Sequence, residues 1–204
     1  MRSIRSLIPL LAALVVGTIS CSDSNAPDTT RPPQDLNFAR LASGTPSLLN
    51  AEESFYAKKG EDREVRIFFQ SSTGDGEEEF LRLRVRPGSL LARPDGTPFQ
   101  NGDSVLITVR VADPVNILFD LEPSGLSFSP AEPAEIKIHY NHADHDFNED
   151  HSIDVLDSQI KAQLSIWRQE TLSDPFIRVG SVNAEDLEEI DADILGFSRY
   201  AIAY

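Results

Sequence analysis

The acidic segment from Asp146 to Asp157 carries the side chains of this chain that are best suited to bind a metal ion. It places oxygen-bearing side chains at positions 1, 3, 5, 9 and 12 of a 12-residue window, and the backbone carbonyl of position 7 completes the set. Calcium prefers such oxygen ligands, and a tight loop around one ion presents alternating residues to it. The candidate calcium ligands are Asp146, Asn148, Asp150, Ser152, Asp154 and Asp157.

The spacing of these ligands resembles that of an EF-hand loop. Aspartate at position 12, where EF-hands have glutamate, makes the segment more similar to the dockerin-type loop. His151 stands where glycine normally supplies a positive φ, so we expect His151 to be left-handed at a cost on the order of 1 kcal/mol. The resemblance implies a calcium-binding insertion over residues 141–158. The alternative is an acidic surface loop without a metal.

Histidines in the same neighbourhood offer a second metal chemistry. All 4 histidines of the chain lie between residues 139 and 151. Imidazoles beside carboxylates suit zinc or copper, which makes a metal-dependent hydrolase the rival interpretation. Their spacing matches no familiar zinc site, and no nucleophile–base pair or second ligand set stands elsewhere in the chain. We therefore expect a protein that is not an enzyme.

Short alternating runs predict the strands that hold this segment in place. Three prolines, Pro123, Pro130 and Pro133, exclude central pairing before the fifth of these runs and indicate a corner between two sheets. The sequence predicts an all-β fold, an antiparallel β-sandwich of about eight short strands with an inserted calcium-type loop. The predicted strands are 65–69, 80–85, 105–111, 116–121, 136–140, 162–168, 176–182 and 194–204.

Three details of this pattern need separate expectations. Trp167 has the opposite parity to Leu164 and Ile166, so we expect a bend or bulge to bury its indole ring. Residues 183–190 are acidic and are expected to form a turn or a short helix. Alternating arginines at 82, 84 and 86 are expected to be a solvated face that balances nearby acids.

The charge of the chain limits its partners. Its formal net charge is −15. Such an acidic protein is repelled by phosphate backbones and by anionic lipid, so no nucleic-acid partner is expected.

The N-terminus predicts export and anchoring. Arg2 and Arg5 precede an apolar run at 7–16 that is too short to span a bilayer, and the single cysteine, Cys21, follows it. This segment resembles a bacterial lipoprotein leader, with Thr18 where leucine is usual, and the resemblance implies lipidation of Cys21. We expect a signal peptide over 1–20, a lipidated cysteine and flexible tether over 21–50, and a domain over 51–204. An ordinary secreted protein with an incidental cysteine is the alternative.

Four short motifs stand between Leu83 and Tyr204. They are Val-Arg-Pro-Gly-Ser-Leu at 85–90, Gly-Leu-Ser-Phe-Ser at 125–129 followed by Pro133, Trp167, and Gly-Phe-Ser-Arg-Tyr-Ala at 196–201. In this order they resemble the ZU-five domain, the β-sandwich of ankyrins, netrin receptors and zonula-occludens proteins. The resemblance implies a protein-interaction or scaffold module.

Some members of that family cleave their own chain within His-Phe-Ser. Here Gly196, Phe197 and Ser198 form a degenerate version of the motif, without the histidine. The serine hydroxyl needs a base before it can attack the preceding carbonyl, so no self-cleavage is expected.

Together these observations predict a non-catalytic binding or scaffold module, lipid-anchored in the bacterial cell envelope and stabilised by calcium. Its partner would be a protein or another envelope component. The two alternatives are the metal-dependent hydrolase and a periplasmic lipoprotein that binds a small ligand, which would require a sizeable apolar pocket.

Overall fold

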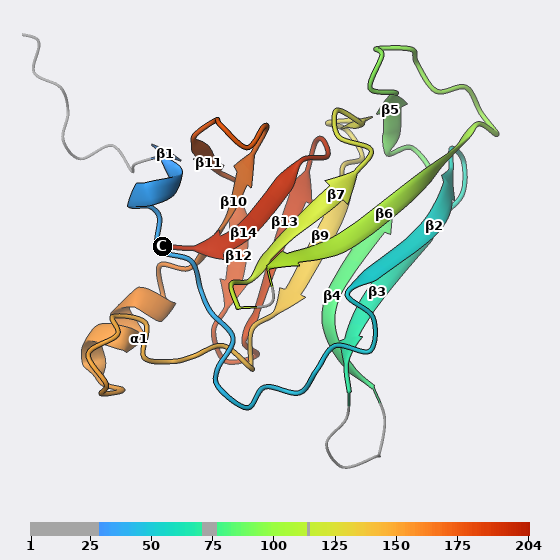
Figure 1. The fold of residues 1–204 in the computed structure, drawn as a ribbon. Helices are drawn as coiled ribbons and strands as arrows, with labels where there is room; N and C mark the ends of the chain where they lie inside the picture. Colours follow the sequence, from blue (N-terminus) through green and yellow to red (C-terminus); the bar gives the residue numbers. More distant parts are fainter. Residues whose placement is uncertain (1–28, 71–76, 114) are drawn as a thin grey trace, which may run out of the picture.

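Alternation of apolar and polar residues along the chain builds two antiparallel sheets that pack face to face. The computed structural model describes residues 29–70, 77–113 and 115–204, so the predicted signal peptide and Cys21 lie outside the described residues. One sheet has the order β1-β11-β10-β14-β7-β6-β2, the second has the order β12-β13-β9-β4-β3, and β5 and β8 form a separate ribbon (Figure 1). The predicted all-β antiparallel sandwich is confirmed.

The elements within the described residues are more numerous than predicted, and their bounds differ from the predicted ones. Before the corner they are β1 (Thr30–Arg31), η1 (Pro33–Asp35), β2 (Glu52–Lys58), β3 (Arg63–Phe69), β4 (Glu78–Val85), β5 (Leu90–Ala92), β6 (Ser104–Asp113) and β7 (Leu118–Glu122). After it they are β8 (Ser127–Phe128), β9 (Ala134–His139), α1 (Val155–Lys161), β10 (Ser165–Gln169), β11 (Phe176–Arg178), β12 (Ser181–Ala184), β13 (Glu189–Ile194) and β14 (Arg199–Ala203).

Strands β2 and β13 were missed because their outward positions are strongly polar. In β13 the inward residues Ile190, Ala192 and Ile194 are buried, while acidic residues alternate with them. The turn expected over 183–190 is present but is confined to residues 185–188, because β12 ends at Ala184 and β13 begins at Glu189 and pairs with both β12 and β9. Alternation alone predicts such a strand, but its acidic composition hid it.

The core lies between the two sheets and is built from the inward positions of each strand. The inward residues predicted for β4 and β9 are all buried, for example Leu83 and Ile136, which face each other across the strand pair. Burial of each such aliphatic side chain stabilises the fold by about 1.5–3 kcal/mol. This core fixes which residues of every strand face outward.

The outer face of the five-stranded sheet is a set of cross-strand ion pairs. Arg84 pairs with Asp62 at 2.5 Å, and Lys137 pairs with Glu189 at 2.7 Å. The basic positions of β4 thus face acids on neighbouring strands and turns, as expected for a solvated face. Exposed pairs of this kind contribute little to stability.

The N-terminal segment is packed against the domain and is not a tether. Strand β1 pairs with β11, and isolated bridges join Phe38 to Ala203 and Leu48 to Phe69. Leu36 is 5% exposed and Ala39 is 1% exposed. The predicted flexible tether is therefore wrong for residues 29–50. Its few apolar residues show no periodicity because each one fills a separate site on the folded sheet.

Trp167 is buried by this N-terminal segment and not by a bend. Strand β10 pairs with β14 in unbroken register from Ser165 to Gln169, so the predicted bend or bulge is absent from this pairing. The indole packs instead on the outer face of the sheet with Leu36 and Phe176, in a second small core. Its Nε1–H donates to the carbonyl of Ala203 at 3.1 Å. Both faces of β10 are thus covered.

Leu36→Ala should destabilise the domain by about 2–4 kcal/mol, because it opens a cavity over the indole of Trp167. Chemical unfolding of the protein without its leader measures this change. Leu49→Ala is the matched control, since Leu49 lies in the same segment but is 43% exposed. Its cost should stay within about 0.5 kcal/mol. Equal small losses for both variants would mean that the segment does not belong to the folded domain.

Candidate functional site

The acidic loop connects β9 to α1 at one end of the sandwich, where Figure 1 shows the short helix. Helix α1 begins directly after Asp154, whose side chain accepts a hydrogen bond from the amide of Leu156 at 2.7 Å. The carboxylate of Asp157 in turn accepts the amide N–H of Asp154 at 2.9 Å, which completes a capping box. The last two predicted calcium ligands therefore also start the helix.

The first ligand positions hold the bend of the loop. The carboxylate of Asp146 accepts the amides of Asp150 at 3.0 Å and of His151 at 2.9 Å. Asp150 in turn accepts the amide of Ser152 at 2.9 Å. His151 has a φ of 68°, which confirms the left-handed conformation predicted for it. The loop thus has the turn that its spacing implied, held by its own side chains.

Asp157 ties the two ends of the loop together. Its carboxylate also accepts the amide of Asn148 at 3.2 Å, and only 2% of the residue is exposed. The hydrogen bond from the Asp154 amide, with further backbone bonds, holds the pKa of Asp157 below its ordinary value despite burial. The carboxylate is therefore charged at neutral pH.

The predicted ligands are close in sequence but are not arranged around one point. Among residues 29–70, 77–113 and 115–204, no group of three or more His, Cys, Asp or Glu residues is placed to hold a metal ion. The donor set contains only oxygen, which suits calcium in kind. In the present conformation the carboxylates bind backbone amides, so the calcium site stays a prediction.

Different histidines lie beside different carboxylates. The Nε2 atom of His142 lies 2.9 Å from Glu78, and that of His145 lies 3.3 Å from Glu188. The contact with His142 lowers the pKa of Glu78. These pairs fasten the loop to β4 and to the turn before β13. They do not converge as zinc or copper ligands would.

The degenerate self-cleavage motif lies at the start of β14, where Ser198 is only 4% exposed. The Nε–H of Arg168 donates to the Ser198 hydroxyl at 2.9 Å. A guanidinium cannot take a proton from a serine, because it is always charged and has no acceptor. A Cβ on Gly196 would lie 3.1 Å from the carbonyl of Leu126, so even a histidine would be crowded there.

The purified protein should therefore migrate as one uncut chain, because the group that contacts Ser198 is a donor and not a base. Intact-mass spectrometry checks this, and Ser198→Ala serves as the reference, since it cannot cleave by this route. A fragment that begins at Ser198 in the wild type and is absent from Ser198→Ala would contradict the assignment.

A polar groove on the outer face of the seven-stranded sheet is the feature that the sequence did not reveal. Antiparallel pairing aligns one outward residue from each of five neighbouring strands into a single row. The row consists of Glu52, Arg110, Asp120, Arg199 and Gln169, contributed by β2, β6, β7, β14 and β10. Four of the five belong to residue types that carry charge, and their signs alternate along the row.

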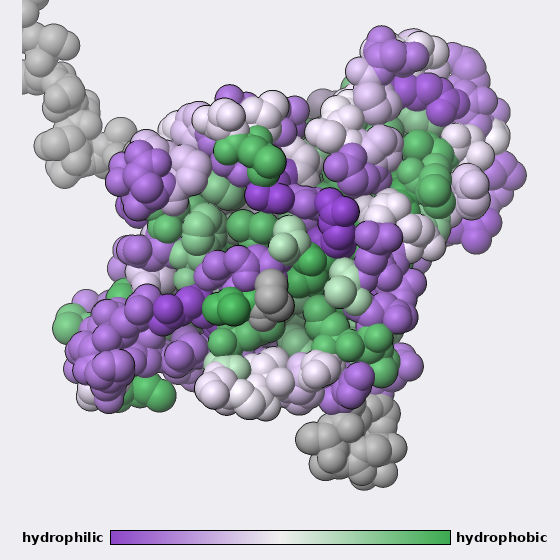
Figure 2. Space-filling model, viewed as in Figure 1, coloured by the Kyte–Doolittle hydropathy of each residue, from purple (hydrophilic) through white to green (hydrophobic). Residues whose placement is uncertain are grey.

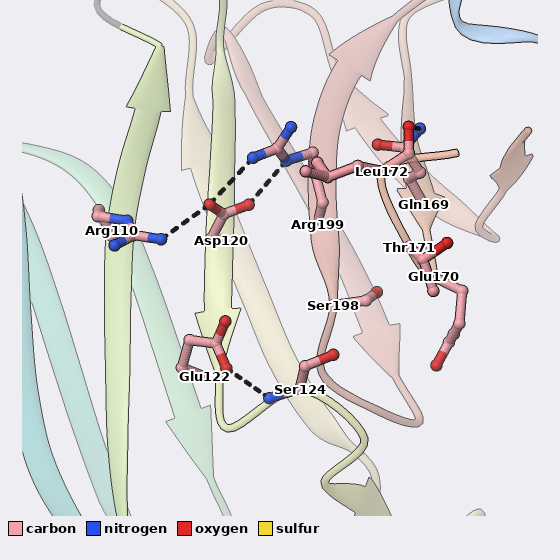
Figure 3. Close-up of a pocket in the computed structure, with 10 residues that line it drawn as sticks. All are labelled: Arg110, Asp120, Glu122, Ser124, Gln169, Glu170, Thr171, Leu172, Ser198 and Arg199. Carbon is pink, nitrogen blue, oxygen red and sulfur yellow. Dashed lines mark hydrogen bonds and ion pairs between the residues drawn. The ribbon is translucent and has the colours of Figure 1, made fainter. Parts of the chain in front are cut away.

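Asp120 is the centre of this row and binds both arginines. Arg199 donates to it through Nε at 2.8 Å and through Nη2 at 3.1 Å, and Arg110 donates through Nη2 at 3.1 Å (Figure 3). Burial acts to raise the pKa of Asp120, but the two guanidiniums outweigh it and hold the pKa below its ordinary value. The carboxylate thus stays ionised and orients both cations.

Two turns form the walls of the groove. Glu122, the last residue of β7, accepts the amide of Ser124 in the following turn at 2.6 Å. In the turn after β10, the buried amide of Gln169 donates to the carbonyl of Asp174 at 2.8 Å, and Asp174 accepts the amide of Thr171 at 3.1 Å. The groove between these walls has a volume of about 420 Å³. Side-chain bonds to the backbone therefore shape it before any ligand arrives.

The arginines and the aspartate were visible in the sequence only as polar residues on the outward side of strands. No spacing connects positions that are roughly ten to eighty residues apart. Only the pairing of β6, β7 and β14 brings them together, so the register of the sheet was the missing signal.

Comparison with known proteins adds no family to this geometry: no family model, no curated protein and no solved structure matches the chain. The ZU-five resemblance therefore stays a prediction. Within the described residues, no helix is long and apolar enough to cross a membrane.

Proposed function

We propose that this protein is a non-catalytic binding module, exported and lipid-anchored through Cys21 in the bacterial cell envelope, and that it binds its partner in the groove above Arg110, Asp120 and Arg199. One observation carries the binding role. The groove is an open concavity whose floor and walls are already fixed by hydrogen bonds. Preorganised polar groups lose little conformational entropy on binding.

Uneven covering of the sheet supports this choice. The N-terminal segment covers β10, which carries Trp167, together with β11 and part of β14. Among the described residues, this segment leaves the same face of β6 open, and Arg110 is half exposed there. Figure 2, seen from this side, shows hydrophilic residues among the apolar ones across the middle of the face. A partner could therefore reach the groove without displacing any of the described elements.

The catalytic alternative gains no such support. A metal-dependent hydrolase would use the histidines and aspartates as one group, whereas His142 and His145 bind different acids. The groove contains Ser198, but its neighbour Arg168 supplies positive charge and no proton acceptor. Binding is the role that these contacts favour.

A photo-crosslinking residue at position 172 should form adducts with an envelope component in living cells, because Leu172 lines the groove and is 71% exposed. Position 182 is the matched control, since Val182 is 70% exposed on the edge of the other sheet. Arg110→Glu should remove the adducts formed at position 172. Adducts that are identical at both positions, or that persist in the Arg110→Glu protein, would contradict binding in the groove.

We further propose that calcium stabilises the acidic loop. Asp146, Asp150, Asp154 and Asp157 place four formal negative charges within 12 residues. Like charges at this spacing repel one another, and a divalent cation would offset that repulsion. The left-handed φ of 68° at His151 already supplies the bend that such a loop requires. The ion would act as a structural clamp between β9 and β10.

Millimolar calcium should raise the melting temperature relative to chelator. With aspartate at position 12 we expect a dissociation constant on the order of 10⁻⁵ to 10⁻³ M. Calcium about a hundredfold above that constant would add about 2.7 kcal/mol to stability. Asp150→Asn should abolish the calcium response, because it removes one charge while keeping an acceptor for the Ser152 amide.

Asp144→Asn is the control for this measurement, since Asp144 lies just before the ligand positions and also accepts a backbone amide. Its calcium response should equal that of the wild type. Equal melting temperatures with chelator and with calcium would rule the clamp out. A rise with zinc alone would assign the loop to the histidines.

Small-ligand carriage is a second candidate function, favoured by one separate observation. A cavity of about 550 Å³, with mainly apolar lining, lies between the 41–51 segment and residues Phe69, Val111 and Val115. This volume suits a small apolar molecule. The groove remains the stronger candidate because its polar groups are already oriented.

A further inference from the structure

We propose that the groove binds an amino-carboxylate zwitterion, such as a free amino acid or the two termini of a short peptide. Arg110 would bind the carboxylate, and Glu122 would bind the ammonium group. This inference rests on the proposed function, because it names the ligand class of the same groove.

Of the two arginines on the floor of the groove, Arg110 has the more exposed guanidinium. Arg110 and Arg199 share the single carboxylate of Asp120. Arg199 uses two of its nitrogens on Asp120, whereas Arg110 uses only Nη2 in that pair and is half exposed. The remaining N–H groups of Arg110 are therefore open to an anionic group. Its orientation by Asp120 suits a planar carboxylate.

The wall of the groove carries the opposite charge. Of its two glutamates, Glu170 is paired with Arg168, so its charge is balanced. The Oε2 atom of Glu122 accepts the Ser124 amide, and its second oxygen can accept another hydrogen bond. Figure 3 shows Glu122 and Ser124 at one end of the view, with the two arginines and Asp120 at the other. The groove thus offers a cation and an anion at separate places.

Ser198 adds a directed donor between these ends. Its hydroxyl oxygen accepts the Nε–H of Arg168 at 2.9 Å. The hydroxyl proton is then left to donate, either to the neighbouring Tyr200 hydroxyl or to a carboxylate in the groove. Ser198 is among the lining residues together with Ser124 and Thr171. These neutral groups would satisfy the peptide or carboxylate oxygens of the ligand.

The charge of the whole protein favours a zwitterion over a simple anion. A net charge of −15 repels anions at long range and attracts cations. A cation alone would find the floor of the groove positive, whereas an anion alone would meet Glu122. A zwitterion carries no net charge, and it complements both groups.

Triglycine is the probe for this proposal, and amide chemical shifts of the intact mature protein are the readout. Saturable shifts at Ser124, Leu172 and Ser198 are expected at millimolar triglycine. N-acetyl-triglycine and triglycinamide, which each lack one terminal charge, should bind at least about tenfold more weakly, since charged hydrogen bonds contribute about 1.5–3 kcal/mol each.

Two variants assign the two ends. Arg110→Gln should remove the preference for a free carboxylate but keep the preference for a free ammonium group, and Glu122→Gln should do the reverse. Arg84→Gln is the control, since Arg84 is exposed to a similar degree and also pairs with an aspartate, but on the other sheet. It should bind triglycine as the wild type does. Unfolding curves establish that each variant is folded.

Absence of saturable shifts with triglycine would overturn the ligand class, and so would an affinity for either blocked peptide equal to that for triglycine. Preferences that both variants leave unchanged would overturn the assigned residues. If crosslinks from position 172 still depend on Arg110 in that case, the groove binds a partner of another chemical class. Absence of those crosslinks from the wild-type protein would contradict the proposed function itself.

Discussion

Burial of one side of every strand between two sheets is the constraint on which the rest of this structure depends. Side chains alternate across a strand, so a slip of one residue would send a core set such as Leu81, Leu83 and Val85 into water. The core therefore fixes the register of each pair of strands. That register then decides which polar residues become neighbours on the outside, where Arg110, Asp120 and Arg199 meet.

Covering of the seven-stranded sheet is asymmetric, and this asymmetry separates a second core from a binding face. Leu36 and Phe176 bury Trp167 on one half, which makes the N-terminal segment part of the domain. On the other half, Arg110, Asp120 and Arg199 form ion pairs, and Arg110 is half exposed. The outer side of the same sheet is thus packed at β10, whereas the proposed binding groove lies over β6, β7 and β14.

The negative charges of the acidic loop and of the groove are compensated by different kinds of group. In the groove, Asp120 lies between two guanidiniums, and the local charge is largely balanced within the protein. In the loop, Asp146 and Asp157 bind backbone amides, whose partial charges compensate the carboxylates only in part. The proposed ligand of the loop is therefore a cation, whereas the proposed ligand of the groove carries both charges.

The sequence by itself determined the fold class, most of the core positions and the bend at His151, because alternation and loop chemistry act between near neighbours. It did not determine the acidic strand β13, the packing of residues 29–50 or the burial of Trp167 without a bulge. Those features depend on contacts with distant strands, which supply the apolar surface that a few scattered residues need. The groove was decided by tertiary structure alone, because Arg110, Asp120 and Arg199 become neighbours only through the register of β6, β7 and β14.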